Sequence, residues 1–366
     1  MFFKRKKEKD FDVELVELLP EENEDCDESE LCLSETDDEP CEDTELRPEV
    51  YTMKEGSFLS NDGITDVSYY VFTPTRAEPK AMIQLSHGMC EYLLRYEPLA
   101  RALCEKGYIF FGNDHLGHGK TAESEEDLGF TAVGGGGAIL VKDLHKLTNI
   151  MKDTYPHLPV VLIGHSMGSF IARLYIEHFA DDICACVIVG TGGPEAPAAI
   201  GKKLAQIIIN KEGERSRSKL LDKLAFGSYN KKFKNELIPH AWLTRDEAVR
   251  EAYDADKFCN YKFTARGFYD LFDMLAAVSK KEWAENVSKD LPILIMSGDK
   301  DPVGNYGKGT RKVYERLAKA GVADVTLRLY VDGRHELFNE INKEVVIRNT
   351  VEWIEERLPN KEQIRA

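Results

Sequence analysis

The chain of 366 residues carries a formal net charge of −16, and 43% of its residues are hydrophobic and 31% charged. No stretch approaches the roughly 20 apolar residues that a membrane-spanning helix needs, and no basic stripe stands out to neutralise phosphates, which argues against nucleic-acid binding. The eight cysteines follow no regular spacing, so neither a disulfide framework nor a zinc site is predicted. Acidic residues rather than an apolar stretch follow the basic start, so no secretory signal is predicted. We expect a soluble, cytoplasmic, globular protein.

Most of the negative charge is concentrated at the N-terminus. Residues 1–50 carry six basic and twenty acidic side chains, which leaves the rest of the chain close to neutral. Few aliphatic residues and no periodicity occur between residues 21 and 49, a composition typical of disordered segments. We therefore expect residues 1–48 to form a disordered acidic tail. Its basic start, residues 1–7, is interpreted as solvated rather than membrane-bound, because an anionic surface would repel the acids that follow.

Apolar runs and amphipathic stretches alternate beyond residue 49. Strand-forming residues at 50–59 and 67–72 flank the turn signal Asn61-Asp62-Gly63, which predicts an antiparallel hairpin. Further strands are predicted at 81–86, 108–113, 159–164, 183–190, 292–297 and 325–331. Helices are predicted at 97–106, 138–151, 167–179, 308–320 and 344–358.

This alternation of strands and helices predicts an α/β fold. Continuous apolar strands separated by helices are typical of a mostly parallel sheet that is covered on both faces. The alternation stops at residues 192–289, which are more helical and more charged and contain no clean strand. We predict a core formed by residues 49–191 and 290–366, interrupted by a helical cap insertion at 192–289.

The strongest chemical signal is Gly164-His165-Ser166-Met167-Gly168, which matches the pattern G-x-S-x-G. It lies at the junction between the predicted strand at 159–164 and the predicted helix at 167–179. Such a sharp turn exposes the serine hydroxyl above the sheet, and the two glycines let the strand and helix pass closely. Ser166 is therefore predicted to be a nucleophile rather than a structural serine.

A serine hydroxyl needs a base to take its proton, and the base needs an acid to orient it. His335 follows the last predicted strand and is the candidate base, in the chain order serine, aspartate, histidine. Asp299 and Asp301 both follow the strand at 292–297, and either could supply the acid. We favour Asp301, because its distance from the strand end suits a reach toward the histidine, and expect Asp299 to brace the loop.

Two backbone amides are expected to stabilise a developing oxyanion. One belongs to Met167, directly after the nucleophile, and the other to Met89, in the loop His87-Gly88-Met89-Cys90 after the strand at 81–86. His87 is interpreted as orienting this loop. Cys90 has no base placed for it and is not predicted to be a nucleophile.

No metal or cofactor site is predicted. His115 and His118 lie on a glycine-rich turn, but no second cluster of ligands accompanies them, so a structural turn is favoured. The glycines at 134–137 lack the residues of a P-loop and the spacing of a dinucleotide site.

Five motifs in this order resemble those of the α/β-hydrolase superfamily, in its branch of monoacylglycerol lipases, lysophospholipases and S33-type serine aminopeptidases. They are His87–Tyr96 (HGMCEYLLRY), Asn113–Thr121 (NDHLGHGKT), Gly164–Ser169 (GHSMGS), Ser297–Val303 (SGDKDPV) and Gly333–Glu340 (GRHELFNE). The resemblance spans about residues 50–358. It implies Ser166, Asp301 and His335 as a catalytic triad, Met89 and Met167 as oxyanion amides, and residues 192–289 as a cap that selects the substrate. Thr121 stands where the family more usually has serine, and the acidic tail has no counterpart.

The resemblance implies an ester hydrolase that forms an acyl-enzyme on Ser166, with a single-chain lipid ester such as a monoacylglycerol or lysophospholipid as substrate. Neither a cofactor nor a nucleic-acid partner is expected. The apolar residues Ile200, Leu204, Ile207 and Ile208 could line an acyl tunnel, touch a membrane or micelle, or pack on the core. Phe268, Tyr269, Phe272 and Met274 are candidate walls of the substrate pocket.

Three alternatives remain open. One is a carboxylesterase for small soluble esters. Another is an aminopeptidase, which would need an acidic anchor in the cap; Glu247, Glu251, Asp254 and Asp256 could supply it. The last is a catalytically silent binding protein, against which an intact set of serine, aspartate and histidine argues. Substrate head group, chain length and oligomeric state do not follow from the sequence.

Overall fold

One sheet of ten strands runs through the computed structural model, which describes residues 4–8, 11–17, 49–194, 197–236 and 240–359. The strand order is β1-β2-β10-β9-β8-β7-β5-β6-β4-β3. Neighbours from β2 to β6 pair in parallel, while β1, β4 and β3 pair antiparallel with β2, β6 and β4. The strands are β1 (Lys4–Glu8), β2 (Phe11–Val16), β3 (Tyr51–Leu59), β4 (Asp66–Pro74), β5 (Ala81–Ser86), β6 (Tyr108–Asn113), β7 (Val160–His165), β8 (Ala185–Val189), β9 (Ile293–Gly298) and β10 (Val325–Tyr330).

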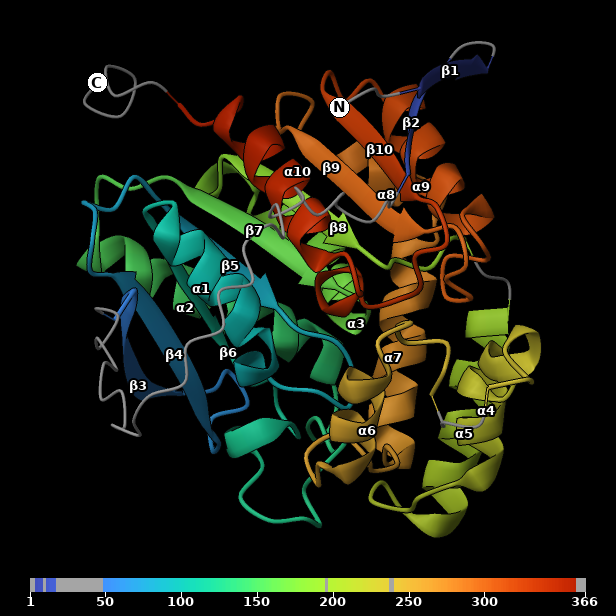
Figure 1. Ribbon diagram of the computed structural model, residues 1–366. Helices are drawn as coiled ribbons and strands as arrows, with labels where there is room; N and C mark the ends of the chain where they lie inside the picture. Colours follow the sequence, from blue (N-terminus) through green and yellow to red (C-terminus); the bar gives the residue numbers. More distant parts are fainter. Residues whose placement is uncertain (1–3, 9–10, 18–48, 195–196, 237–239, 360–366) are drawn as a thin grey trace, which may run out of the picture.

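Helices cover both faces of this sheet, as the α/β prediction requires (Figure 1). Two of them, α1 (Glu97–Glu105) and α10 (Lys343–Glu355), pack on one face. The opposite face is covered by α2 (Gly136–Thr154), α3 (Met167–His178) and α9 (Lys308–Lys319). The predicted α/β-hydrolase fold is confirmed by this arrangement.

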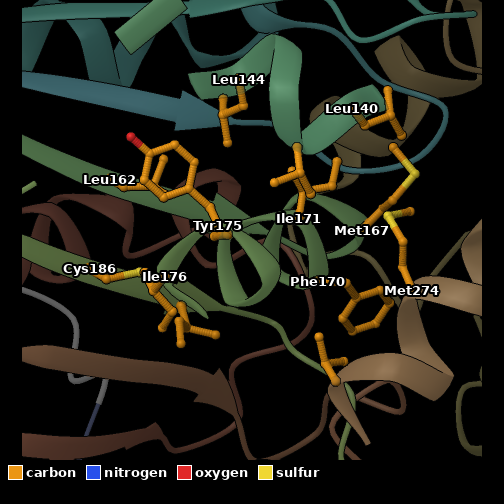
Figure 2. Close-up of a cluster of buried hydrophobic side chains, with 14 of the residues drawn as sticks. Leu140, Leu144, Leu162, Met167, Phe170, Ile171, Tyr175, Ile176, Cys186 and Met274 are labelled. Atoms are coloured by element: carbon orange, nitrogen blue, oxygen red, sulfur yellow. The ribbon is translucent and has the colours of Figure 1, made fainter. Parts of the chain in front are cut away.

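The hydrophobic core is divided between the two faces because successive side chains of a strand point in opposite directions. In β7, Leu162 packs with α2 and α3, whereas its neighbours Val161 and Ile163 face the α1 and α10 side. Figure 2 shows the first of these layers, where side chains of α3 such as Ile171 and Tyr175 meet Leu144 of α2 and Leu162. All six residues of β7 are buried, which explains why its first four residues, Val160 to Ile163, are all apolar.

The N-terminal segment differs from the expected disordered tail. Two strands lie within residues 4–16, and β2 extends the sheet by pairing with β10. Val13 and Val16 are buried there, and Glu14 forms an ion pair with Arg328 at 2.7 Å. These two valines contribute the buried apolar contacts of β2, a signal that the charge of the surrounding segment obscures. The strongly acidic stretch at residues 18–48 lies outside the described residues.

The chain between β8 and β9 is helical, as predicted, in the part that the structure describes. It contains α4 (Pro197–Glu212), α5 (Lys219–Phe226), α6 (Glu247–Ala255), α7 (Ala265–Val278) and α8 (Lys281–Asn286). The long helix α7 packs against α2, α3 and α4, so it connects this insertion to the core. In Figure 1 the arrowheads of β7 and β9 point toward the side of the molecule on which α7 lies. The carboxyl ends of the parallel strands therefore face the insertion.

A buried arginine contacts the chain both before α4 and at the end of α7. Arg173 of α3 donates hydrogen bonds to the Gly192 carbonyl at 3.1 Å and to the Val278 carbonyl at 2.6 Å. Its guanidinium also stacks over the ring of Trp283. Since Gly192 precedes α4 and Val278 ends α7, one side chain of the core contacts the chain on both sides of the stretch from α4 to α7. No helix among the described residues is long and apolar enough to cross a bilayer.

Candidate active site

Ser166 occupies the sharp turn between β7 and α3. Its φ of 53° and ψ of −118° are strained for a residue with a side chain. Its N–H donates to the Val189 carbonyl at 3.0 Å, which anchors the turn to β8. The two glycines of the motif are required by close contacts: a Cβ on Gly164 would lie 2.5 Å from the Gly168 carbonyl oxygen, and one on Gly168 would lie 2.0 Å from the Ser86 carbonyl oxygen. The predicted turn geometry is thus present around Ser166.

Asp301 and His335 lie against each other at the carboxyl ends of β9 and β10. His335 Nδ1 is 3.1 Å from both carboxylate oxygens of Asp301, and both side chains are almost completely buried. The Val303 N–H donates to Asp301 Oδ1 at 2.8 Å and fixes the carboxylate. Asp299 has the bracing position predicted for it, since it accepts a hydrogen bond from the Asp332 N–H at 2.8 Å. The structure therefore brings Asp301, rather than Asp299, to the histidine.

The strand β8 links this pair to Ser166. The residue after β8, Gly190, has a φ of 60°, and a Cβ there would lie 3.0 Å from His335 Cε1. The preceding residue, Val189, accepts the Ser166 N–H, so the serine turn and the histidine ring contact adjacent residues of the chain. The His335 ring also packs against His165 and Trp242, with ring centroids 4.8 and 4.9 Å away.

The loop predicted to supply an oxyanion amide lies beside the serine. A Cβ on Gly88 would lie only 3.0 Å from Ser166 Cβ, which explains why a glycine stands there. The next residue, Met89, lines the same cavity as Ser166 and Met167. Met167 is the first residue of α3, where backbone N–H groups lack partners within the helix and favour negative charge.

A buried network of charges connects the three loops of the site. Glu91 accepts hydrogen bonds from the Gly88 N–H and from Arg95 Nη1, the latter at 2.9 Å. Its Oε1 also lies 2.9 Å from His165 Nδ1. Arg95 continues to Glu336 with two hydrogen bonds of 2.9 and 3.0 Å, and Glu336 directly follows His335. The loop at Gly88, the serine turn and the loop of His335 are therefore held by one set of alternating charges.

The charges of this network support one another. Burial opposes ionisation of Glu91, but the charges of His165 and Arg95 outweigh it and hold the pKa of Glu91 well below its usual range. Burial likewise opposes the charged form of His165, yet its carboxylate partner Glu91 raises the pKa of His165. The carboxylate of Glu336 is kept ionised by Arg95, which lowers the pKa of Glu336 against the effect of burial. Sequence reasoning assigned no role to this network, although Glu91 and Arg95 stand in a motif that it singled out.

A cavity of about 570 Å³ opens at Ser166. Its lining is mostly apolar and comes from both the core and the insertion. The lining residues are Met89, Ser166, Met167, Phe170, Gly192, Ala198, Leu224, Ala225, Phe226, Ser228, Tyr229, Lys231, Lys232, Trp242, Leu271, Phe272, Leu275, Pro302, Val303, Asn305 and Tyr306. A cavity of this size, with mostly apolar walls and a few polar side chains, is typical of a small-molecule site.

The candidate walls named from the sequence are only partly confirmed. Phe272 lines the cavity, whereas Phe268 and Met274 are buried in the core, and Tyr269 is half-buried outside the lining. The sequence places all four on one helical stretch but does not separate the side that faces the cavity from the side that faces the core. On α4, Ile200 and Ile207 are exposed, with 66% and 62% of their surface accessible.

The other candidate residues have structural roles in the described part of the chain. His87 Nε2 accepts the His115 N–H at 3.0 Å, while its Nδ1 lies 2.8 Å from the Gly88 carbonyl oxygen, so it orients the loop as expected. Burial lowers the pKa of His115 and that of His118. No group of side chains suited to hold a metal occurs among the described residues. Burial raises the pKa of the Cys90 thiol well above its usual value, so the reactive thiolate is disfavoured.

Fold and site together define a member of the α/β-hydrolase superfamily. A family model described as "Serine aminopeptidase, S33" matches residues 77–342, and the chain belongs to this family. It is 28% identical to a monoacylglycerol lipase of Mycolicibacterium smegmatis, over 83% of this chain and 97% of that protein. It is 31% identical to a monoglyceride lipase of Homo sapiens, over 72% of this chain and 78% of that protein. A carboxyl esterase from Bacillus coagulans has a similar structure, with a TM-score of 0.78 and 28% identity over 83% of this chain and 98% of that one.

Proposed function

We propose that this protein is a serine hydrolase that cleaves esters of single-chain lipids, such as monoacylglycerols or lysophospholipids. The observation that carries the proposal is the position of Ser166 on a strained turn in the wall of a mostly apolar cavity. A buried Asp301–His335 pair lies against Gly190, the residue after the one that accepts the Ser166 N–H. Relatives named monoacylglycerol lipase and monoglyceride lipase support a lipid ester as substrate.

In the proposed reaction, Ser166 Oγ attacks the ester carbonyl carbon while His335 Nε2 takes the hydroxyl proton. Asp301 holds the imidazole through Nδ1 and stabilises its charged form. The N–H groups of Met89 and Met167 donate to the oxyanion. His335 then gives its proton to the departing alcohol, which leaves the acyl group on Ser166. A water molecule, deprotonated by His335, attacks this acyl-enzyme, and collapse of the second intermediate releases the fatty acid and restores the serine.

We further propose that the insertion at 192–289 acts as a cap over this reaction. Its helices contribute several large apolar side chains to the cavity, among them Leu224, Phe226 and Leu271. Such side chains suit an acyl chain, because burying each methylene contributes about 0.8 kcal/mol.

A carboxylesterase of small esters is the second candidate. The similarity to the Bacillus coagulans carboxyl esterase, at 28% identity over nearly all of that chain, favours it. The aminopeptidase alternative has less support. Asp254 pairs with His240, Asp256 accepts from Tyr92, and neither they nor Glu247 and Glu251 line the cavity at Ser166. These four acidic residues therefore do not supply an anchor for a substrate amine at the cavity.

Labelling with a fluorophosphonate probe tests the proposal. The wild type should be labelled, and Ser166→Ala should not. Ser169→Ala is a matched control, because this serine lies one turn away and donates to the Ser166 carbonyl rather than facing the cavity. Hydrolysis of p-nitrophenyl esters of increasing acyl length then separates the candidates: a long-chain optimum supports the lipid ester, and a short-chain optimum supports the carboxylesterase. A folded wild type that resists the probe would contradict both.

A further inference from the structure

The cavity at Ser166 has charge of only one sign in its described lining. Lys231 and Lys232 are its charged residues, and no aspartate or glutamate accompanies them among the described lining residues. Both lysines are exposed and follow α5 on a short helical turn, Tyr229–Lys232. The apolar walls therefore end at a cationic rim, and this rim gives the cavity a polar and an apolar part.

The rim is structurally connected to the catalytic loop. The ammonium group of Lys232 lies 3.2 Å from the centroid of the Tyr306 ring, a cation–π contact that restrains the lysine at the cavity. Tyr306 in turn donates its N–H to the Asp301 carbonyl at 2.8 Å. Asn305 and Tyr306 also adopt left-handed backbone conformations, with φ of 48° and 56°. Such strain in residues with side chains persists only where the surroundings enforce it, and it presents both residues to the cavity.

The surrounding segment is basic although the whole chain is acidic. Residues 202–234 contain ten lysines and arginines against three acids, in a protein of net charge −16. Several of these cations already have partners, such as Lys202 with Asp273 and Arg215 with Asp127. At the cavity itself the charged lining residues are Lys231 and Lys232, which should attract an approaching anion and so raise its encounter rate and its affinity.

We propose that the preferred substrate is a single-chain lipid whose head group carries a phosphate with net negative charge, rather than a neutral monoacylglycerol. This inference rests on the ester-hydrolase function proposed above and specifies its head group. Lysine ammonium groups are common ligands of phosphate and add charge-assisted hydrogen bonds that a glycerol hydroxyl cannot match. The acyl chain would occupy the apolar walls while the phosphate meets Lys231 and Lys232, which places the ester between them at Ser166.

The test compares two substrates that differ only in the phosphate: octanoylglycerol and octanoylglycerol 3-phosphate, both below their critical micelle concentrations so that binding to aggregates does not contribute. The wild type should show kcat/KM at least about tenfold higher for the phosphate ester. In the double variant Lys231→Gln/Lys232→Gln this ratio should fall about tenfold or more. Lys234→Gln is the matched control, because this lysine is exposed in the same segment but does not line the cavity, and it should change the ratio less than about twofold.

Salt provides a second readout. A tenfold rise in ionic strength should lower kcat/KM for the phosphate ester more than for the neutral ester, because it screens the lysines. Equal rates on the two substrates in the wild type would overturn the inference, as would a double variant that preserves the wild-type ratio. Failure of the function itself is distinguished by p-nitrophenyl octanoate, since an enzyme that hydrolyses neither this ester nor the two lipids contradicts the proposed hydrolase.

Discussion

Glu91→Gln should destabilise the protein far more than the same change at Glu97. Both glutamates form ion pairs with an arginine four residues later, Arg95 and Arg101, at 2.9 Å. The environments differ: 2% of the Glu91 side chain is accessible against 36% of Glu97. The two substitutions therefore separate the effect of burial from that of the pair itself.

The magnitude follows from the groups that Glu91 satisfies. Its carboxylate meets the Gly88 N–H, the Tyr96 hydroxyl, His165 and Arg95. A glutamine amide has only one oxygen, so at least one of these donors would face an NH₂ group. His165 would also lose its charged partner. Breaking a buried ion pair from one side costs about 3–5 kcal/mol, whereas an exposed helical pair contributes about 0.3–0.5 kcal/mol.

Urea unfolding of the wild type and both variants measures this difference. We expect the free energy of unfolding to fall by about 3–5 kcal/mol in Glu91→Gln and by less than about 1 kcal/mol in Glu97→Gln. Because Glu91 also holds the loop beside Ser166, kcat/KM should fall about a hundredfold in the first variant only. Equal losses of stability in the two variants would refute the reasoning that burial makes this network important.

Two further predictions concern titration and backbone packing. Burial raises the pKa of Asp270 on α7 to about 6 from its usual 3.8, so ionisation of this carboxyl opposes folding. The wild type should therefore lose up to about 3 kcal/mol of stability relative to Asp270→Asn as the pH rises from about 4 to about 7. Urea unfolding of both proteins at several pH values in this range measures the difference in their free energies of unfolding, and a difference that does not change with pH would contradict the prediction. Gly168→Ala should cost more than about 3 kcal/mol, because its Cβ would lie 2.0 Å from the Ser86 carbonyl oxygen. Gly63→Ala, in open space with a φ of +82°, should cost only about 1–2 kcal/mol. Thermal unfolding compares the two variants, and equal losses of stability would disprove the steric argument.

The core elements could be predicted from sequence because their signals are local. The strands β5 and β6 begin and end at the predicted residues, since each is a continuous apolar run between clear boundaries. The signal of the turn at Ser166 is equally local, because the glycines on either side are required by contacts within or next to the turn. The order of serine, aspartate and histidine along the chain then restricted the search for partners to the ends of the later strands.

The features that sequence reasoning missed depend on contacts between distant residues. Arg95 and Glu336 are 241 positions apart, and neither has a local pattern that indicates its partner. The valines of β2 give too short an apolar signal to stand out in an acidic segment, and only β10 reveals their role. Lys231 and Lys232 belong to a polar stretch whose position at a cavity depends on how the insertion packs. Local periodicity contains none of this information.

The pairing of β2 with β10 joins the strand that is synthesised early to the one that is synthesised last. Glu14 meets Arg328 across 314 positions of the chain. In an unfolded chain, closing a loop of that length costs about 5 kcal/mol of entropy. Once β3 to β10 have formed, only residues 17–50 tether β2 to the folded body, and the cost falls to about 3 kcal/mol. We therefore expect the first strands of the sequence to be the last to dock, so that they complete the sheet edge only after the rest of the protein has folded.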